Sequence, residues 1–346
     1  MRAPRAVRPA PKGWTRRNGP MALAERLGRW PDLLPFHLAA SVTLDLSGPA
    51  SGRATSRVLD SEFYALAASV AIQDGPAGFT PDEEGFGGSP NLSPQNLWAQ
   101  TDLAEEGGGR RLSNQPVSIG AMWGRGDRPF LFPAPFILPA GRAVIVEVDH
   151  FGVQGAIGTS FHFVLHGFKR LNSTPPLPGD VFLEPRILDA LRTYSDRGAL
   201  GRVEPFWYSL MLGHDRLGAV SNFIPGLTEA PLVTIADADF LGLYIMADFY
   251  DSVGSPYIVD APNYPAAHLV RFVIDEGRRR LDDRPMAIRN VTGISKRWMK
   301  LPYPLVIRRG QTFSAIVTPQ LRQLTVDNRW VGRVTVAGVR VLRGGR

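Results

Sequence analysis

Histidines and carboxylates are the residues of this chain best suited to chemistry, and their spacing does not form a catalytic set. His162 and His166 stand four positions apart in a segment that alternates apolar and polar residues, so both are expected on one face of a β-strand. Zinc enzymes with a similar histidine pair carry it on a helix, with a glutamate beside the first histidine, and that glutamate is absent here. We interpret both as surface or core histidines rather than as metal ligands.

Two other histidines have an aspartate next to them, in Asp149–His150 and His214–Asp215. Neighbouring residues on a strand point to opposite faces, so the sequence alone does not make either pair a base with its orienting carboxylate. The chain has no nucleophile elbow, phosphate-binding loop or dinucleotide fingerprint. It also has no Cys, which excludes disulfides, zinc–thiolate sites and a cysteine nucleophile. We predict no catalytic residue, no cofactor and no metal site.

Acidic residues also gather at 82–84 and 102–106, inside a long stretch (74–115) rich in Gly, Pro, Ser and Asn. Their spacing is not that of a calcium-binding loop, so a solvated loop is predicted. Long loops in compact domains tend to be functional or mobile.

The elements that carry these residues are organised by an internal repeat. Pro133–Gly141 reads Pro-x-Pro, three apolar residues, two variable residues and Gly, and Pro302–Gly310 repeats this pattern 169 positions later. Three further pairs of segments follow the same order at offsets of 170, 177 and 171, which indicates a tandem duplication. The residues that define the repeat are Phe36, Phe63, Pro133, Pro135, Gly141 and Gly167 in the first copy, and Phe206, Phe240, Pro302, Pro304, Gly310 and Gly338 in the second.

The repeat also bears on a possible carboxylate pair. Asp237 and Asp239 have the spacing of paired carboxylates, but Asp60 and Glu62 stand at the matching places of the first copy. The same placement in both copies points to a structural role, on a face expected to be solvated.

Each copy consists of short strand-like segments separated by turns, in keeping with 30 Pro and 36 Gly. Strands are predicted near 36–46, 57–72, 117–123, 129–137, 142–148 and 160–168, and near 206–213, 231–236, 240–249, 268–274, 286–292, 303–308, 312–317 and 331–342. Strands and helices do not alternate regularly, which disfavours a parallel α/β fold. The sequence predicts an all-β protein of two tandem duplicated antiparallel β-sandwiches that are jelly-roll-like. A short helix precedes each, at 21–27 and 187–194.

These elements divide the chain into four parts. A basic extended arm occupies residues 1–20, the first β-sandwich 21–172, a Pro-rich linker 173–185 and the second β-sandwich 186–346. No run of about 18 apolar residues is present, so no transmembrane helix and no membrane partner are predicted.

The formal net charge of +7 is concentrated at the N-terminus. Residues 1–30 hold eight basic residues and one acid, whereas the rest of the chain is neutral. Such an arm is either a solvated tail or a segment that lies on an acidic partner surface or on packaged nucleic acid, without reading bases. The arm residues expected to contact a partner are Arg2, Arg5, Arg8, Lys12, Trp14, Arg16 and Arg17.

The segments Phe130–Gly141, Val144–Val148 and Val164–Arg170 resemble a pattern of bacteriophage virion structural proteins with tandem jelly-roll or β-sandwich domains. These are capsid auxiliary or decoration proteins, neck proteins or double-jelly-roll capsid subunits. The resemblance implies a non-enzymatic virion component assembled in the host cytoplasm. Its partners would be other virion proteins, either copies of itself or a major capsid protein. A homo-oligomer is expected, a trimer being one form, and the family supplies no catalytic residues.

Two other functions stay open at this point. A carbohydrate- or receptor-binding β-sandwich module would need exposed aromatic residues on one face, and Trp98, Trp123, Trp207 and Tyr208 are the candidates, although core packing would explain them as well. A jelly-roll enzyme such as a polysaccharide lyase would need His, Tyr, Arg or carboxylates that converge in a groove.

Overall fold

The structure is a computed structural model, and the parts of the chain that it describes form four β-sheets. These parts are residues 33–44, 50–74, 99–107, 109–124, 129–150, 159–170, 202–212, 230–251, 269–274, 279–294, 298–318 and 330–342. All strand pairs within them are antiparallel except for one two-residue parallel pair. The prediction of an all-β chain is confirmed.

The first sandwich contains eight strands in two sheets. They are β1 (Leu33–Leu44), β2 (Ala50–Arg57), β3 (Glu62–Asp74), β4 (Ala99–Glu105), β5 (Val117–Ser118), β6 (Phe130–Leu138), β7 (Ala143–His150) and β8 (Thr159–Arg170), with the one-turn helix α2 (Ile119–Met122) after β5. One sheet has the order β1-β8-β3-β6 and the other β2-β7-β4-β5.

The second sandwich repeats this plan. Its strands are β9 (Arg202–Leu212), β10 (Leu232–Thr234), β11 (Asp239–Asp251), β12 (Leu269–Ile274), β13 (Arg279–Arg280), β14 (Met286–Ala287), β15 (Gly293–Ile294), β16 (Met299–Ile307), β17 (Thr312–Thr318) and β18 (Trp330–Leu342), with α4 (Ile288–Val291) after β14. One sheet contains β9-β18-β11-β16 and the other β10-β17-β12-β13, with β14 beside β12.

Both sandwiches therefore have the same strand order. In each, the first long strand pairs with the last, the last with the third, and the third with the strand that carries the Pro-x-Pro motif. This is the strand order of the eight-stranded jelly roll with its two Greek keys. The predicted tandem antiparallel sandwiches are confirmed.

Alternation along the strands explains why each sandwich closes. In β1, Leu38, Ala40, Val42 and Leu44 are buried, while the residues between them are exposed. The buried side chains of both sheets then meet in one hydrophobic cluster per sandwich, and that of the first extends into the second.

The repeat-defining glycines occupy matching turns. Gly141 and Gly310 have φ of 79° and 84°, a left-handed conformation that suits Gly. The N–H of Gly141 donates to the carbonyl of Val58, and that of Gly310 donates to the carbonyl of Ile235, both at 2.7 Å. The same turn thus leads into β7 and β17.

A second matched feature is a β-bulge in the third long strand of each jelly roll. The register of β3 shifts between Ala65 and Ala67, opposite Gly167, and that of β11 shifts between Gly242 and Tyr244, opposite Gly338. A Cβ atom at Gly167 or Gly338 would collide with the backbone carbonyl of Tyr64 or Leu241. These glycines allow the close approach of the two strands.

The structure differs from the expected elements in four segments. Residues 50–57, most of which lie between two predicted strands, form β2, and residues 99–105, expected as loop, form β4. The segments near 117–123 and 286–292 were expected as strands, but each is a two-residue strand followed by a helical turn. The basic arm, both expected helices and the linker lie outside the described residues.

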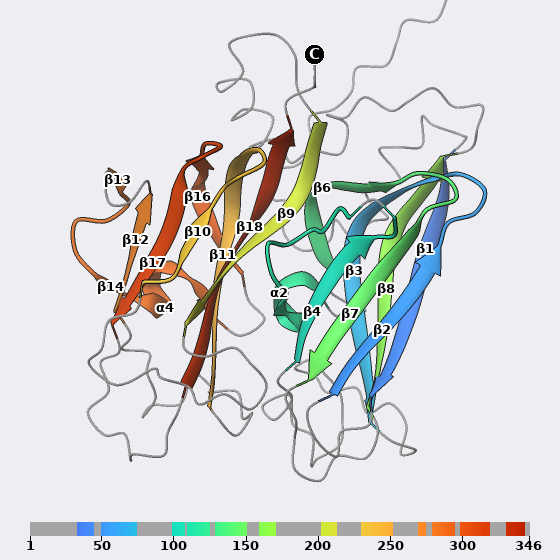
Figure 1. Cartoon of the computed structure of the whole chain (residues 1–346), viewed down its shortest axis with the longest axis horizontal. Helices are drawn as coiled ribbons and strands as arrows, with labels where there is room; N and C mark the ends of the chain where they lie inside the picture. Colours follow the sequence, from blue (N-terminus) through green and yellow to red (C-terminus); the bar gives the residue numbers. More distant parts are fainter. Residues whose placement is uncertain are drawn as a thin grey trace, which may run out of the picture.

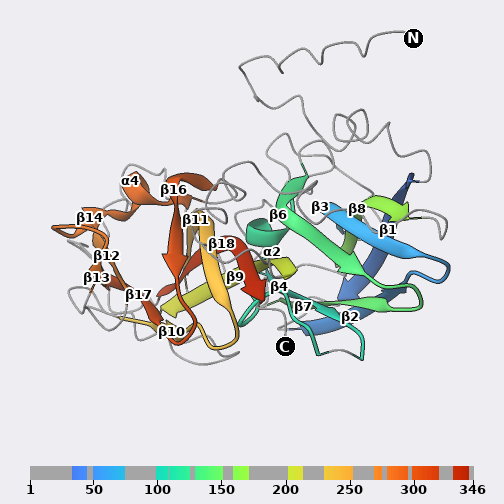
Figure 2. The same cartoon turned by 90° about the horizontal axis from the view of Figure 1, so that it is seen from above.

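The two jelly rolls lie side by side, and their long strands run in broadly the same direction (Figure 1). The view from above shows β6 and α2 of the first jelly roll next to β9 and β18 of the second (Figure 2). The outer surface of the β9-β18-β11 sheet therefore packs against one side of the first sandwich.

Candidate functional site: the seam between the two jelly rolls

We call this contact the seam: β6, α2 and residues 110–115 of the first jelly roll against the outer surface of β9, β18 and β11. Trp207, on β9, is its largest anchor and is fully buried. Its indole N–H donates to the carbonyl of Ala121 at 3.0 Å, and its ring lies 5.8 Å from that of Phe130 and 5.5 Å from that of Phe132. A buried aromatic with its polar atom satisfied is typical of a permanent interface.

Backbone hydrogen bonds also cross the seam. The N–H of Trp207 donates to the carbonyl of Leu112 at 2.8 Å, and the N–H of Asn114 donates to the carbonyl of Trp207 at 3.2 Å. The side chain of Asn114 both accepts from the N–H of Ser209 (2.8 Å) and donates to its carbonyl (3.1 Å). Residues 112–114 thus run along β9 like an additional short strand, which fixes the relative position of the two jelly rolls.

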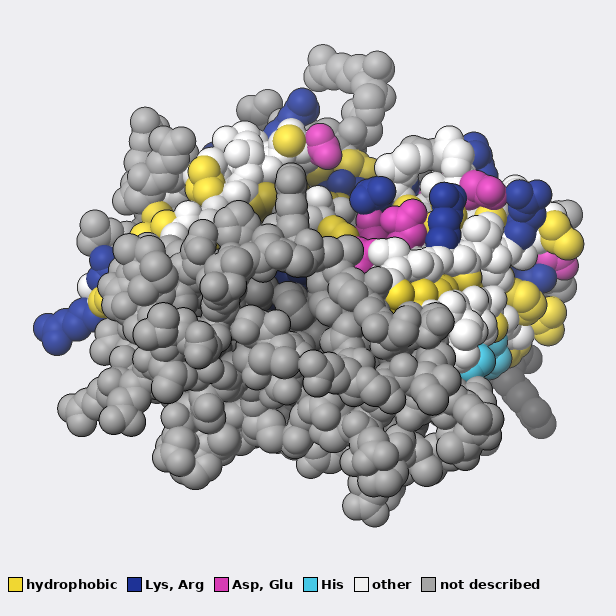
Figure 3. All heavy atoms as spheres, turned by 60° about the horizontal axis from the view of Figure 1, so that its bottom comes forward, with side chains coloured by type: hydrophobic (Ala, Val, Ile, Leu, Met, Phe, Trp, Pro, Cys, Tyr) yellow, Lys and Arg dark blue, Asp and Glu magenta, His cyan; other side chains and the backbone are white. Residues whose placement is uncertain are grey.

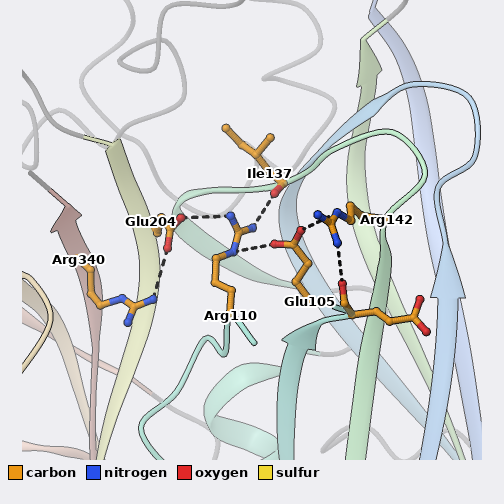
Figure 4. Close-up of polar contacts among 7 residues, drawn as sticks. Glu105, Arg110, Ile137, Arg142, Glu204 and Arg340 are labelled. Carbon is orange, nitrogen blue, oxygen red and sulfur yellow. Dashed lines mark hydrogen bonds and ion pairs between the residues drawn. The ribbon is translucent and has the colours of Figure 1, made fainter. Parts of the chain in front are cut away.

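Charged side chains close one end of the seam (Figure 4). Glu204, on β9, is buried and binds Arg110 of the first jelly roll at 3.2 Å and Arg340 of its own at 3.4 Å. Arg110 also donates to the carbonyl of Ile137 at 2.6 Å and pairs with Glu105 at 3.3 Å. The two guanidinium groups offset the free-energy cost of burying the Glu204 carboxylate. Loss of that carboxylate would leave the positive charges of Arg110 and Arg340 without their shared partner.

Further polar contacts lie beside this network. Arg333, buried on β18, donates to the side-chain oxygen of Gln100 at 2.6 Å, across the seam. Asp102 is buried, accepts a hydrogen bond from the hydroxyl of Ser113 at 3.0 Å and forms an ion pair with Arg111 at 2.8 Å. Burial raises the pKa of Asp102, and the positive charge of Arg111 opposes that rise.

Because the two jelly rolls are copies of one repeat, each seam residue has an equivalent position in the other jelly roll, and the surroundings of the two positions can be compared. On the buried side of the second jelly roll, Trp207, Ala337 and Met246 belong to the cluster shared with the first. Their counterparts in the first jelly roll are His37, His166 and Ser69, by the repeat offsets of 170, 171 and 177. His37 is exposed and His166 is half-buried. The seam face of the second jelly roll is therefore apolar and covered, whereas its counterpart in the first is polar and partly open.

On the half of the seam that belongs to the first jelly roll, the residues are buried and their equivalents in the second jelly roll are exposed. Ala134 and Leu112 of the first jelly roll are 1% and 0% exposed; Ala134 packs against Leu241 and Val339 of the second jelly roll, and the carbonyl of Leu112 accepts from the N–H of Trp207. Their counterparts 169 positions later, Tyr303 and Leu281, are 82% and 38% exposed. Each half of the seam thus has a counterpart that the chain itself leaves open.

The repeat-defining aromatic residues share a cation contact in both jelly rolls. Phe63 and Phe240 are fully buried. The ammonium of Lys169 lies 3.9 Å from the ring centre of Phe36, and the guanidinium of Arg340 lies 3.9 Å from that of Phe206. Such contacts are worth on the order of 1 kcal/mol.

The repeat-defining prolines lie in the strands at one edge of each sheet. Pro133 and Pro135 lie in β6, and Pro302 and Pro304 in β16. An edge is where a missing N–H costs least. The predicted arm contacts, Arg2 to Arg17, lie outside the described residues.

The carboxylates compared through the repeat lie in different surroundings. Asp60 pairs with Lys169 at 2.7 Å and Asp237 lies 3.9 Å from Arg340, both near the surface. The hydrogen bond from Lys169 lowers the pKa of Asp60. Asp239 was expected on a solvated face, but it is buried and accepts from the N–H of Arg309 at 2.7 Å. Burial with a backbone donor is a structural role.

The histidines lie where strand alternation places them. His162 and His166 share the outer face of β8, and His162 lies 2.9 Å from the hydroxyl of Ser41. The side chains of His150 and His214 are outside the described set. Among the described residues, no group of three or more His, Asp or Glu is arranged to hold a metal ion. No helix in the described part of the chain is long and apolar enough to cross a membrane.

Sequence reasoning did not single out Glu204 or Arg110, the charged centre of the seam, and it left Trp207 as either a possible sugar-binding aromatic or a core residue. One signal was present: Glu204 is an acid at the start of an apolar strand, where the first copy has Leu34. When one copy of the repeat has a charged residue where the other has an apolar one, the charged residue indicates a contact that only its own copy makes.

Comparison with known proteins gives limited likeness. The sequence matches no family model and no curated protein. A chain in the atomic structure of Sulfolobus Turreted Icosahedral Virus has a TM-score of 0.22 and 9% identity, over 88% of this chain and 61% of that one. A chain from the triple jelly roll and turret assembly of an archaeal virus has a TM-score of 0.20 and 10% identity, over 87% and 59%.

A chain of infectious bursal disease virus, Gx strain, has a TM-score of 0.19 and 10% identity, over 91% and 73%. This chain thus spans less than two thirds of the length of the two archaeal virus chains. With TM-scores of 0.22 or lower, these likenesses carry no argument about function.

Proposed function

We propose that this chain is a non-enzymatic structural subunit of a virion, of the bacteriophage kind that its sequence resembles, and that copies of it assemble head to tail. The observation that carries the proposal is the pair of open faces that correspond to the two halves of the seam. One is the β16 face, formed by β16 and Leu281. The other is the β1–β8 face, the outer surface of β1 and β8.

The β16 face has the composition of an interface. Tyr303 and Leu281 are exposed apolar side chains, and Met299 and Leu301, on the same strand as Tyr303, are half-buried and pack against the core of the second jelly roll. Their counterparts in the first jelly roll, Ala134, Leu112, Phe130 and Phe132, line the seam. Exposed aromatic and aliphatic residues on one face are typical of protein contacts.

The β1–β8 face is the complementary surface. Pro35, His37 and Ala39 on β1 are exposed, and His166 on β8 is half-buried. Their counterparts Pro205, Trp207, Ser209 and Ala337 form the covered side of the seam. A second copy could therefore place its β16 face on the β1–β8 face of the first in the manner in which the two jelly rolls of one chain meet.

Such a contact uses different surfaces on the two partners, so it generates a ring or an open filament. A ring of three chains would place six jelly rolls around one axis and could fit a hexagonal lattice. We accordingly propose a trimer. Its further partners are other virion proteins, such as a major capsid protein, and its basic arm would contact an acidic surface or nucleic acid without sequence preference. Its place would be the shell, its decoration or the neck.

The alternative functions are less well supported by the described residues. A carbohydrate-binding module needs exposed aromatic residues, but Trp123, Trp207 and Tyr208 are buried, and Trp98 lies outside the described residues. An enzyme needs carboxylates and bases that converge in a groove, whereas Glu204, Glu105 and Asp102 are engaged with arginines of the seam.

Sedimentation velocity of the full chain tests self-assembly. We expect a concentration-dependent oligomer that Tyr303→Arg abolishes, because a cation on the β16 face would be desolvated without a partner. Leu59→Arg is the matched control, since Leu59 is 75% exposed and lies between β2 and β3, off both faces. Electron microscopy of concentrated protein would then show whether rings pack in a lattice.

A monomer at all concentrations, or an oligomer unaffected by Tyr303→Arg, would contradict head-to-tail assembly through these faces. A monomer that binds a glycan array would favour the carbohydrate-binding module instead.

A further inference from the structure

Three polar side chains from neighbouring strands form a row on the β1–β8 face. His37 on β1 stands opposite His166 on β8, and their Nδ1 atoms are 3.0 Å apart. The Nε2 atom of His166 lies 2.7 Å from the hydroxyl of Ser69 on β3. The two rings are nearly perpendicular, at 79°, with centres 5.0 Å apart. Histidine side chains reach the molecular surface on one side of the molecule (Figure 3).

The jelly-roll fold does not itself require this row. At the same three positions the second jelly roll has Trp207, Ala337 and Met246, and its strands pair in the same register. The backbone therefore accepts apolar residues there. Two imidazoles facing each other are a property of the first jelly roll alone and call for a separate explanation.

The chemistry of the row is that of a metal ligand pair. If the Nε2–H of His166 donates to Ser69, the Nδ1 atom of His166 carries a lone pair directed at His37. A ligating histidine is usually oriented in this way, by a hydrogen bond from its other ring nitrogen. Burial, together with the neighbouring His37, lowers the pKa of His166, which favours the neutral form that binds metals.

We propose that His37 and His166 form a binding site for a divalent transition-metal ion such as Zn²⁺, with one Nδ1 ligand from each ring and water in the remaining positions. Zinc–nitrogen bonds are about 2.0–2.1 Å long, so a tetrahedral ion needs its two nitrogens about 3.4 Å apart. The present 3.0 Å separation reaches this when both rings turn slightly, so that their Nδ1 lone pairs converge on the ion instead of lying along the line between the two nitrogens.

Proton balance is maintained in this step. In the metal-free pair, the Nδ1–H of neutral His37 donates to the Nδ1 of His166. When the ion binds, the Nδ1 of His37 loses its proton to water and its Nε2 takes one from water, so both rings stay neutral and both Nδ1 lone pairs reach the ion. Acid weakens such binding, because protons compete with the metal ion for the ring nitrogens.

Other charged groups on this face do not take part. Glu62 is engaged with Arg170 at 3.0 Å and with the hydroxyl of Tyr64 at 2.7 Å. His162 lies four residues along β8 and contacts Ser41 instead. Nitrogen ligands without a carboxylate favour zinc, copper or nickel over calcium and magnesium, which prefer oxygen.

Calorimetric titration of the metal-free full chain with Zn²⁺ at pH 7.5 tests the site. We expect His37→Ala and His166→Ala each to weaken binding at least tenfold, and Ser69→Ala to weaken it as loss of an orienting group does, by about 10- to 100-fold. His162→Ala is the matched control, from the same strand and face, and leaves the affinity unchanged. Titration at pH 5.5 should abolish the binding.

Two results would overturn the site: a wild-type chain with no saturable Zn²⁺ binding up to millimolar concentration, or binding that survives His37→Ala. Because His37 is exposed, that variant folds even where His166→Ala does not, so its titration decides the question. Because His37 lies on the β1–β8 face, the titrations are made in the Tyr303→Arg background, in which that face is not covered by a second copy, so that metal binding is separated from self-assembly.

Discussion

Ala134 and Tyr303 occupy the same place in the two jelly rolls and have opposite surroundings. Each lies between the two prolines of a Pro-x-Pro motif in the strand that pairs with the third long strand. Ala134 is 1% exposed against Leu241 and Val339 of the second jelly roll, whereas Tyr303 is 82% exposed. The small residue is present where the second jelly roll packs against the strand, and the large one where none of the described residues covers the strand.

Exchanging the two side chains should therefore have unequal effects. Ala134→Tyr inserts a ring into the packed seam and should lower the free energy of unfolding by about 1–3 kcal/mol, the usual cost of overpacking. Tyr303→Ala should change the stability of the isolated chain by no more than about 0.5 kcal/mol. Urea denaturation at low protein concentration measures both. Equal losses would mean that Tyr303 is packed within the monomer.

The bulge glycines should be among the least replaceable residues. Gly167→Ala and Gly338→Ala would drive Cβ into the carbonyls of Tyr64 and Leu241, which forces backbone movement and should cost roughly 3 kcal/mol or more. Gly310→Ala is the control: it meets no atom within 4 Å and should cost only the strain of a positive φ, about 1 kcal/mol. Thermal unfolding would compare them, and a mild Gly338→Ala would show that the two strands can separate there.

Glu204 should contribute more to the free energy of unfolding than an exposed acid that also forms an ion pair. Glu204→Gln removes the carboxylate that the half-buried Arg110 and the buried Arg340 share and should destabilise the chain by about 3 kcal/mol. Glu106→Gln removes the exposed pair with Arg57 (2.9 Å) and should cost less than about 1 kcal/mol. Urea unfolding followed by tryptophan fluorescence reports on the seam through Trp207. Similar costs would mean that Glu204 is hydrated.

Protonation of His166 at acidic pH should lower the free energy of unfolding. Its pKa is lowered in the folded state, so the neutral form is favoured there and the unfolded chain binds the proton more readily. This contribution is fully present above the unfolded pKa, about 6.5, and is lost progressively as pH falls from there through the lower folded pKa. Unfolding free energies between pH 7.5 and 5.5 should fall less steeply in His166→Ala than in wild type, and equal slopes would show that His166 does not carry the effect.

The basic arm should strengthen assembly electrostatically. Removing residues 1–30 deletes eight basic residues and one acid, so we expect weaker association at low salt and a smaller salt dependence of what remains. Sedimentation of both chains at low and high salt measures this. Identical salt dependence would show that the arm is a solvated tail.

Several features of the fold were predictable because they depend on local chemistry. Alternation in β8 placed Phe161, Phe163 and Leu165 inside and His162 and His166 outside. The repeated Gly before a strand marked the turn at Gly141 and Gly310. Strands β2 and β4 were missed, because β2 reads Ala-Ser-Gly-Arg-Ala-Thr-Ser-Arg and is held chiefly by its pairing with β7, a partner about 90 positions away in sequence.

The sequence by itself determined the strand-rich class, the duplication and the turns, because periodicity, Pro and Gly act within a few residues. Only the tertiary structure decided, for each pair of equivalent positions in the two jelly rolls, which residue is buried in the seam and which is exposed. Glu204 meets Arg110, and His37 meets His166, 129 positions apart, because strand pairing and the packing of one jelly roll on the other bring distant segments together. The two jelly rolls have the same local pattern but different surroundings. One chain forms a single seam, which buries one surface of each jelly roll and leaves the equivalent surface of the other exposed.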